Sequence, residues 1–115
     1  MAIDIQQLTT DIKTAATDIL RADVTTFKGF SERQVKAIAQ QSALVEIGIQ
    51  TGQITDETKD FFLDGLEDMA LNFVRTLRGL QMVTIEKVWN AIVGAIWKAI
   101  QAGIPGITLP VPTLA

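Results

Sequence analysis

Cysteine, histidine and tyrosine are all absent from this chain of 115 residues. Without cysteine the chain forms no disulfide, no thiolate zinc site and no cysteine nucleophile. Without histidine it lacks the usual general base at neutral pH, the commonest metal ligand and the base of nucleophile triads. We therefore expect a protein that is not an enzyme and that carries no cofactor or metal.

Clusters of basic residues are missing as well. The net charge is −3 and the isoelectric point is near 4.8, and no stretch gathers the lysines and arginines that neutralise phosphates. We expect no nucleic-acid partner. The segment from Met1 to Ile5 has neither the basic nor the apolar run of a secretory signal, so no such signal is predicted and the compartment stays open.

Charge is also scarce in the final quarter of the chain. After Lys87 the only charged residue is Lys98, and the same stretch contains both tryptophans, Trp89 and Trp97. Polar side chains normally continue to the end of a globular chain, since its surface is solvated. This quarter is therefore expected to contact apolar material: a bilayer, the rest of its own fold or a neighbouring subunit.

The apolar residues that are present recur at steps of three and four, which is the spacing of one helical face. This periodicity predicts an all-α bundle of about four amphipathic helices, at roughly residues 3–23, 31–51, 55–81 and 84–102. Ser31 and Gln34 fit a capping box, and Thr55 fits a helix N-cap. A single bent helix over residues 55–102 is the alternative, because residues 80–84 contain no proline.

The acidic residues are the remaining candidates for a chemical site, because carboxylates bind metals and support acid–base chemistry. Between Thr55 and Asp68 they are spaced by three and four, as on a helix surface, rather than at the alternate positions of a calcium loop. We expect a solvated face. A buried acid would instead favour an enzyme or ligand-binding bundle. The nearest candidate is Glu46, between Val45 and Ile47, and its simplest placement is at the surface.

The fourth predicted helix is apolar around most of its circumference. A narrow polar stripe interrupts it, made of Lys87, Asn90, Gly94, Lys98 and Gln101. A helix that is apolar nearly all round is buried in protein or in lipid. The fourth helix could form the core of its own bundle or pack at a seam between copies. It could also contact lipid, either by lying in the bilayer interface or by lining a lumen together with other copies.

Residues 104–115 contain all three prolines, which oppose a helix, and apolar side chains at alternate positions. This pattern predicts an extended, proline-rich C-terminal arm beyond a helical domain at residues 1–103. A disordered tail is usually polar, so we expect the arm to dock on its own bundle or on a neighbour. The neighbour is slightly favoured, because a bundle of this size has little free apolar surface.

Together these features predict a non-catalytic structural or assembly protein that packs as a homo-oligomer or with other subunits. Its size and pattern resemble those of small helical components of phage particles or secretion machines, an analogy that names no family. The alternative is a membrane-active or pore-forming protein that inserts residues 85–104 into a bilayer. The predicted interaction residues are Trp89, Ile92, Ile96, Trp97, Ile100, Ile107, Leu109, Val111 and Leu114.

Overall fold

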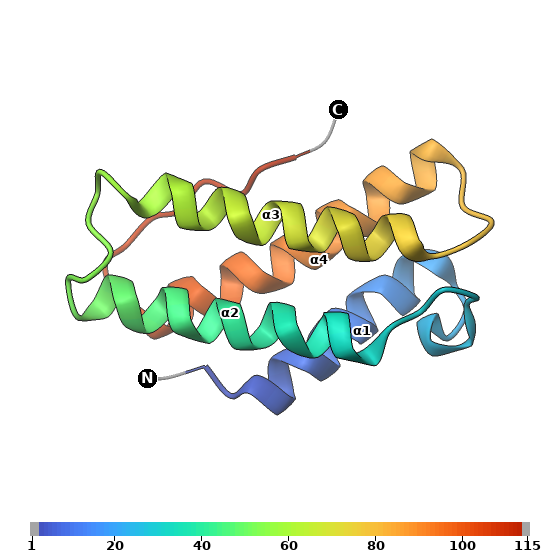
Figure 1. Ribbon diagram of the computed structural model, residues 1–115, viewed down its shortest axis with the longest axis horizontal. Coiled ribbons are helices and arrows are strands. Elements are labelled where there is room, and N and C mark those ends of the chain that lie inside the picture. Colours follow the sequence, from blue (N-terminus) through green and yellow to red (C-terminus); the bar gives the residue numbers. More distant parts are fainter. Residues whose placement is uncertain (1–2, 114–115) are drawn as a thin grey trace.

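Four α-helices make up the bundle in the computed structural model, which describes residues 3–113 (Figure 1). They are α1 (Ile5–Leu20), α2 (Glu32–Gln50), α3 (Lys59–Thr76) and α4 (Met82–Gly103), with a 3₁₀ turn, η1 (Val24–Thr26), after α1. No strand occurs in this part of the chain. The all-α class and the four-helix arrangement are thus confirmed, and the alternative of one bent helix over residues 55–102 is wrong.

The helix boundaries follow from local capping chemistry. Asp4 caps α1 by accepting from the Gln7 N–H at 3.0 Å, and Ser31 caps α2 by accepting from the Gln34 N–H at 3.2 Å. Helix α3 begins four residues later than predicted. Thr55 instead belongs to a turn in which its N–H donates to Thr58 Oγ1 at 2.9 Å, so it does not cap the helix.

The α1–α2 and α3–α4 connections meet at one end of the bundle. The Arg78 N–H donates to the Lys28 carbonyl oxygen at 2.8 Å. Gly29 has a φ of +91°, and a Cβ atom built there would lie 1.8 Å from the Thr76 carbonyl oxygen. Only glycine allows so close an approach of two backbones, so this contact fixes both connections together.

The centre of the core is α4, which contacts each of the other three helices. In Figure 1 it passes behind the antiparallel pair α2 and α3. Its buried residues include Val88, Trp89, Ile92, Val93, Ile96, Trp97 and Ile100. The Trp89 indole N–H donates to the Glu67 carbonyl oxygen at 3.1 Å, so its one polar atom is satisfied. The apolar circumference of α4 is therefore explained by contact within its own chain.

The described part of the C-terminal segment is short, and it shows no separate proline-rich arm. From Ile104 it returns along α3 (Figure 1), without helix or strand. Leu109 is buried, and its N–H donates to Gln101 Oε1 at 3.2 Å. Leu109 thus packs on its own bundle, whereas the sequence slightly favoured docking of this segment on a neighbour. The division into domains at residues 1–103 and 104–115 stays a prediction.

Replacement of Trp97 by alanine tests the role of α4. Trp97 is fully buried, so the cavity left by Trp97→Ala is expected to lower the free energy of unfolding by about 3–5 kcal/mol. Urea titration followed by circular dichroism measures this loss. Val111→Ala removes exposed apolar atoms and is the control, with an expected change within about 0.5 kcal/mol. Equal stability of the two variants would contradict a core position for Trp97.

Candidate functional site

The predicted interaction residues of α4 lie inside the bundle. Trp89, Ile92, Ile96, Trp97 and Ile100 are all buried among the helices of their own chain. Of the others, Ile107 is half-buried, Leu109 is buried and Val111 is exposed, while Leu114 lies outside the described residues. A partner could reach these five α4 side chains only if the bundle opened, so a contact with the folded chain has to involve other residues.

Two general classes of site are not found in the described chain. None of its helices combines the length and the apolar character needed to cross a membrane. Among residues 3–113 no group of three or more acidic side chains is placed to hold a metal ion. Exposed apolar side chains are present, however, and they are concentrated at two places.

The first place is the outer side of the α2–α3 hairpin. Phe61 of α3 is 76% exposed and Leu44 of α2 is 63% exposed, which is unusual for side chains of this size. The Phe61 ring lies edge-on to Phe62, with ring centroids 5.4 Å apart. We define the α2–α3 surface as Leu44, Ile47, Phe61, Phe62 and Met69.

A depression lies within this surface and is lined by Gln41, Phe61, Phe62, Asp64, Gly65, Asp68 and Met69. Its distinctive residue is Gly65, in the middle of α3. A Cβ atom there would meet nothing within 4 Å, so packing inside the chain does not require glycine. Glycine in a helix interior costs about 0.5–1 kcal/mol relative to alanine. The depression is therefore kept at some cost to the stability of α3.

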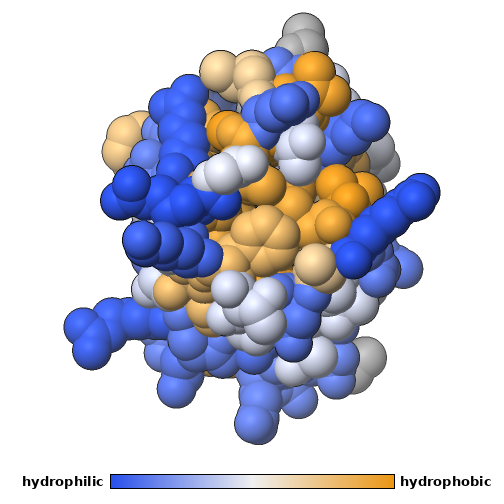
Figure 2. Space-filling view, turned by 90° about the vertical axis from the view of Figure 1, so that its right-hand side faces the viewer, coloured by the Kyte–Doolittle hydropathy of each residue, from blue (hydrophilic) through white to orange (hydrophobic). Residues whose placement is uncertain are grey.

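The second place is the end of the bundle where the two connections meet. Met82 and Val83 are exposed there, at the start of α4. Half-buried neighbours at the same end add apolar area: Leu20, Phe27, Phe30 and Leu80. Figure 2 looks onto this end and shows apolar atoms at its centre with hydrophilic side chains around them. We call it the loop-end surface.

Sequence periodicity could have signalled the α2–α3 surface. Phe61 and Phe62 are adjacent, and neighbouring residues of a helix point about 100° apart, so both cannot face the core fully. Leu44 likewise falls outside the buried positions Val35, Ile38 and Val45. The interaction residues predicted from the sequence lie instead mainly on the most apolar helix, which is the one that the fold buries.

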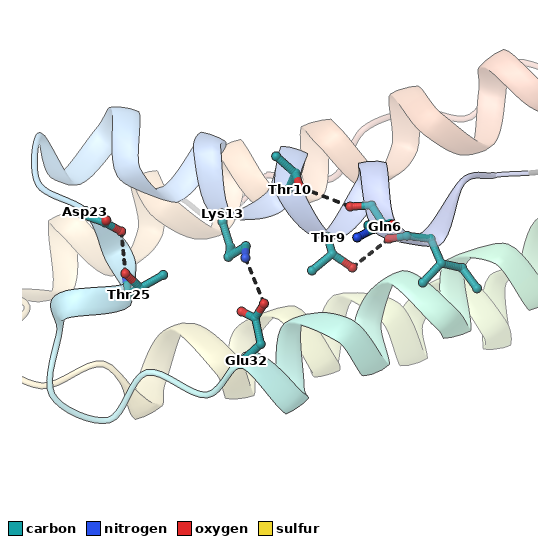
Figure 3. A network of polar contacts seen from close by, with 8 residues as sticks. Gln6, Thr9, Thr10, Lys13, Asp23, Thr25 and Glu32 are labelled. Atoms are coloured by element: carbon teal, nitrogen blue, oxygen red, sulfur yellow. Dashed lines mark hydrogen bonds and ion pairs between the residues drawn. The ribbon is translucent and has the colours of Figure 1, made fainter.

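The outer side of α1 is polar. Figure 3 shows Lys13 pairing with Glu32 at the start of α2, with 2.9 Å between Nζ and Oε1. Nearby, Asp23 accepts hydrogen bonds from the Thr25 hydroxyl and N–H, which lower the pKa of Asp23. These contacts join α1 to α2 and stabilise the turn at η1. They leave little apolar area for a partner.

Acidic side chains border the other side of α3. Asp60, Asp64 and Glu67 line a groove between α3 and the C-terminal segment. Partial burial raises the pKa of Glu67, and the neighbouring charges of Asp64 and Asp68 raise it further. Acidic side chains therefore border both sides of α3, and Asp64 lines this groove as well as the depression beside Phe61.

The position of Glu46 differs from the one expected from the sequence. It was expected at the surface, but it is 0% exposed. Helix α2 buries a second seam in addition to the one through Val45. This seam contains Ala39, Ala43 and Glu46 at steps of four and three. The small alanines let the neighbouring helix approach closely, so α2 buries a larger part of its circumference, and that part includes Glu46.

Comparison of the chain with known protein families, with curated proteins and with solved structures finds no match. Functional inference therefore depends on the chemistry of the surfaces described above. The features that core packing does not explain are the exposed apolar side chains of these two surfaces and the buried acid Glu46.

The raised pKa of Glu67 gives a pH-dependent prediction. When a folded-state pKa is raised, the associated stability is present below the unfolded-state value and is lost as pH rises through the folded-state value. Glu67→Gln removes the charged form and is expected to raise the melting temperature at pH 7, by less as the pH falls toward 4. Thermal melts at several pH values measure this difference. Glu57→Gln, on the exposed turn before α3, controls for net charge, and an equal gain there would contradict a local cause.

Proposed function

We propose that this protein is a non-catalytic structural protein that assembles in several copies, as a component of a particle or machine such as a phage virion or a secretion apparatus. The observation that carries the proposal is the high exposure of Phe61 and of Leu44 on a hairpin that the core already stabilises without them. Surface patches of this kind mark sites of protein association, and aromatic side chains contribute disproportionately to such contacts.

The α2–α3 surface has the form that self-association requires. In a two-fold dimer the same patch serves both partners, so a protruding side chain needs a recess within the same patch. Phe61 protrudes and the recess beside Gly65 lies next to it. In the proposed dimer, Phe61 of each copy packs into the depression of the other. Helix α4 contributes indirectly, because it holds α2 and α3 in place.

The alternative function is a membrane-active protein that inserts residues 85–104 into a bilayer. Insertion would require α4 to leave the core and all three other helices to lose their common packing partner. Fully burying one large aliphatic or aromatic side chain is worth about 1.5–3 kcal/mol, and α4 buries several. Assembly through α2 and α3 leaves the core intact and carries no comparable loss of burial, so assembly is the favoured proposal.

The proposed contact predicts an unusual behaviour of Gly65→Leu. The new side chain fills the depression and is expected to weaken association. It should also stabilise the isolated chain by about 0.5–1 kcal/mol, because leucine favours a helix more than glycine does. Sedimentation velocity over a concentration series measures association, and thermal melts measure stability. Phe61→Ser is expected to weaken association as well. Val83→Ser, at the loop-end surface, is the matched control and should assemble like the wild type.

Salt dependence distinguishes a second copy from another subunit. Asp64 and Asp68 line the depression, so self-association brings like charges together, and added salt should strengthen it by screening. A basic partner would bind more weakly at high salt. A wild-type chain that stays monomeric at all concentrations and salt levels would contradict self-assembly. An unchanged assembly of both Phe61→Ser and Gly65→Leu would contradict the proposed surface.

A further inference from the structure

The loop-end surface combines exposed apolar side chains with positive charge. Met82 and Val83, the first two residues of α4, are 64% and 59% exposed. Phe27 and Leu80 lie half-buried at the same end and pack against the core. Folding covers Phe27 and Leu80 in part but leaves the other two side chains in water. Neighbouring exposed apolar side chains of this kind mark contact sites.

Positive charge is concentrated at this end, although the whole chain is acidic. Residues 21–33 and 75–87 form the two connections and the helix turns next to them. They hold six of the ten basic residues of the chain but only three of its thirteen acidic residues. The rest of the chain has the opposite imbalance, so a net charge of −3 conceals one basic end. The six basic residues, all exposed, are Arg21, Lys28, Arg33, Arg75, Arg78 and Lys87.

The contact between the two connections brings basic residues together. The Arg78 N–H donates to the Lys28 carbonyl oxygen at 2.8 Å, which joins the backbones at these two residues. A Cβ atom built at Gly29 would lie 3.6 Å from Arg78 Cγ, so the stem of Arg78 runs beside the same turn. Two positive side chains from distant parts of the sequence are therefore held at one place.

The six basic side chains are not neutralised by ion pairs within residues 3–113. Of the two ion pairs in this range, one lies at the turn before α3 and the other joins Lys13 to Glu32. Glu32 is one of the three acids at the loop end, so it is already engaged. The second, Asp23, accepts from the Thr25 N–H and hydroxyl, and the third, Glu86, is half-buried. The positive charge of this end is thus available to an anionic partner.

The start of α4 adds to the attraction for anions. The first N–H groups of a helix have no acceptor within the helix, and they lie at the positive end of its dipole. At α4 the side chain of the N-cap residue Gln81 makes no capping hydrogen bond, and the first turn contains no acidic residue. Such a helix start favours an anionic group such as phosphate. Here it lies directly beside Met82 and Val83.

We propose that the loop-end surface docks on the interface of a bilayer that contains anionic phospholipids. Met82 and Val83 enter the apolar side of the interface, while the basic side chains and the start of α4 contact lipid phosphates. A bilayer interface presents anionic and apolar groups next to each other, so it matches both properties of this surface. Helix α4 stays in the core, in contrast to the insertion of residues 85–104 considered above.

The position of the surface suits this partner. It lies at one end of the bundle, whereas the α2–α3 surface lies along the hairpin and shares no residue with it (Figure 1). A protein docked by this end can still associate through α2 and α3, and the proposal does not rest on that association. The acidic α2–α3 surface of a second copy is the competing occupant. A fluid bilayer is favoured because it adapts to protruding side chains without a matching recess.

Flotation of the full chain with vesicles tests this proposal. Binding is expected to vesicles of phosphatidylglycerol and phosphatidylcholine in equal parts. It should weaken as sodium chloride is added and be absent with phosphatidylcholine alone. Lys28→Gln should weaken binding about fivefold. Lys98→Gln makes the same change in the far half of α4 and should bind like the wild type. Met82→Ser should weaken binding about tenfold by removing apolar contact. All three side chains are exposed, so the variants should fold.

Several results would overturn the proposal. One is the absence of binding to the anionic vesicles, and another is equal binding to vesicles of phosphatidylcholine alone. Equal affinity of Lys28→Gln and Lys98→Gln would remove the role of the loop end, and unchanged affinity of Met82→Ser would remove the apolar contact. Loss of self-association of Met82→Ser in sedimentation velocity without vesicles would show that a second copy covers this surface instead. Failed vesicle binding would leave assembly through Phe61 and Gly65 untouched, so the two proposals fail separately.

Discussion

The structure depends on the burial of α4, a helix with almost no polar face. Such a helix is stable in water only if other elements cover its apolar sides. The other three helices all contact α4, and Lys87 and Lys98 of its polar stripe remain exposed. Its isoleucines, valines and tryptophans supply much of the apolar area that is removed from solvent. The Trp89 indole finds a carbonyl oxygen on α3, so this burial leaves its polar atom satisfied.

The same constraint indicates which surface features are not needed for folding. Once α4 is covered, α2 and α3 have used their inward faces, yet Leu44 and Phe61 still point outward. Gly65 weakens α3 without serving a close contact among residues 3–113, and one carboxylate oxygen of Glu46 has no hydrogen-bond partner in the same range. Each of these features costs stability or solubility. A residue that costs stability without serving the fold could usually be replaced by a more stabilising one. Leu44, Phe61, Gly65 and Glu46 therefore direct attention to association and other functional roles.

Sequence periodicity predicted the elements well, because four amphipathic patterns and their polar breaks are local properties. The predicted boundaries differ by only a few residues, as at α3, where a threonine turn precedes the helix. The candidate site could not be predicted in the same way. Whether an apolar helix meets lipid, a partner or its own chain depends on contacts between distant segments. Leu109 packs on its own bundle, and Glu46 is buried by the close approach of neighbouring helices, for the same non-local reason.

Native-state hydrogen–deuterium exchange of the dilute protein, without lipid, is the most direct test of a covered α4. Amides in the most stable core exchange only through global unfolding, whereas exposed or loosely held helices exchange through local opening. If α4 is the centre of the bundle, its amides from Val88 to Ile100 should be among the slowest in the chain, at concentrations where only monomers are present. Rapid exchange of α4 that becomes slow only when vesicles or higher protein concentrations are supplied would contradict this account.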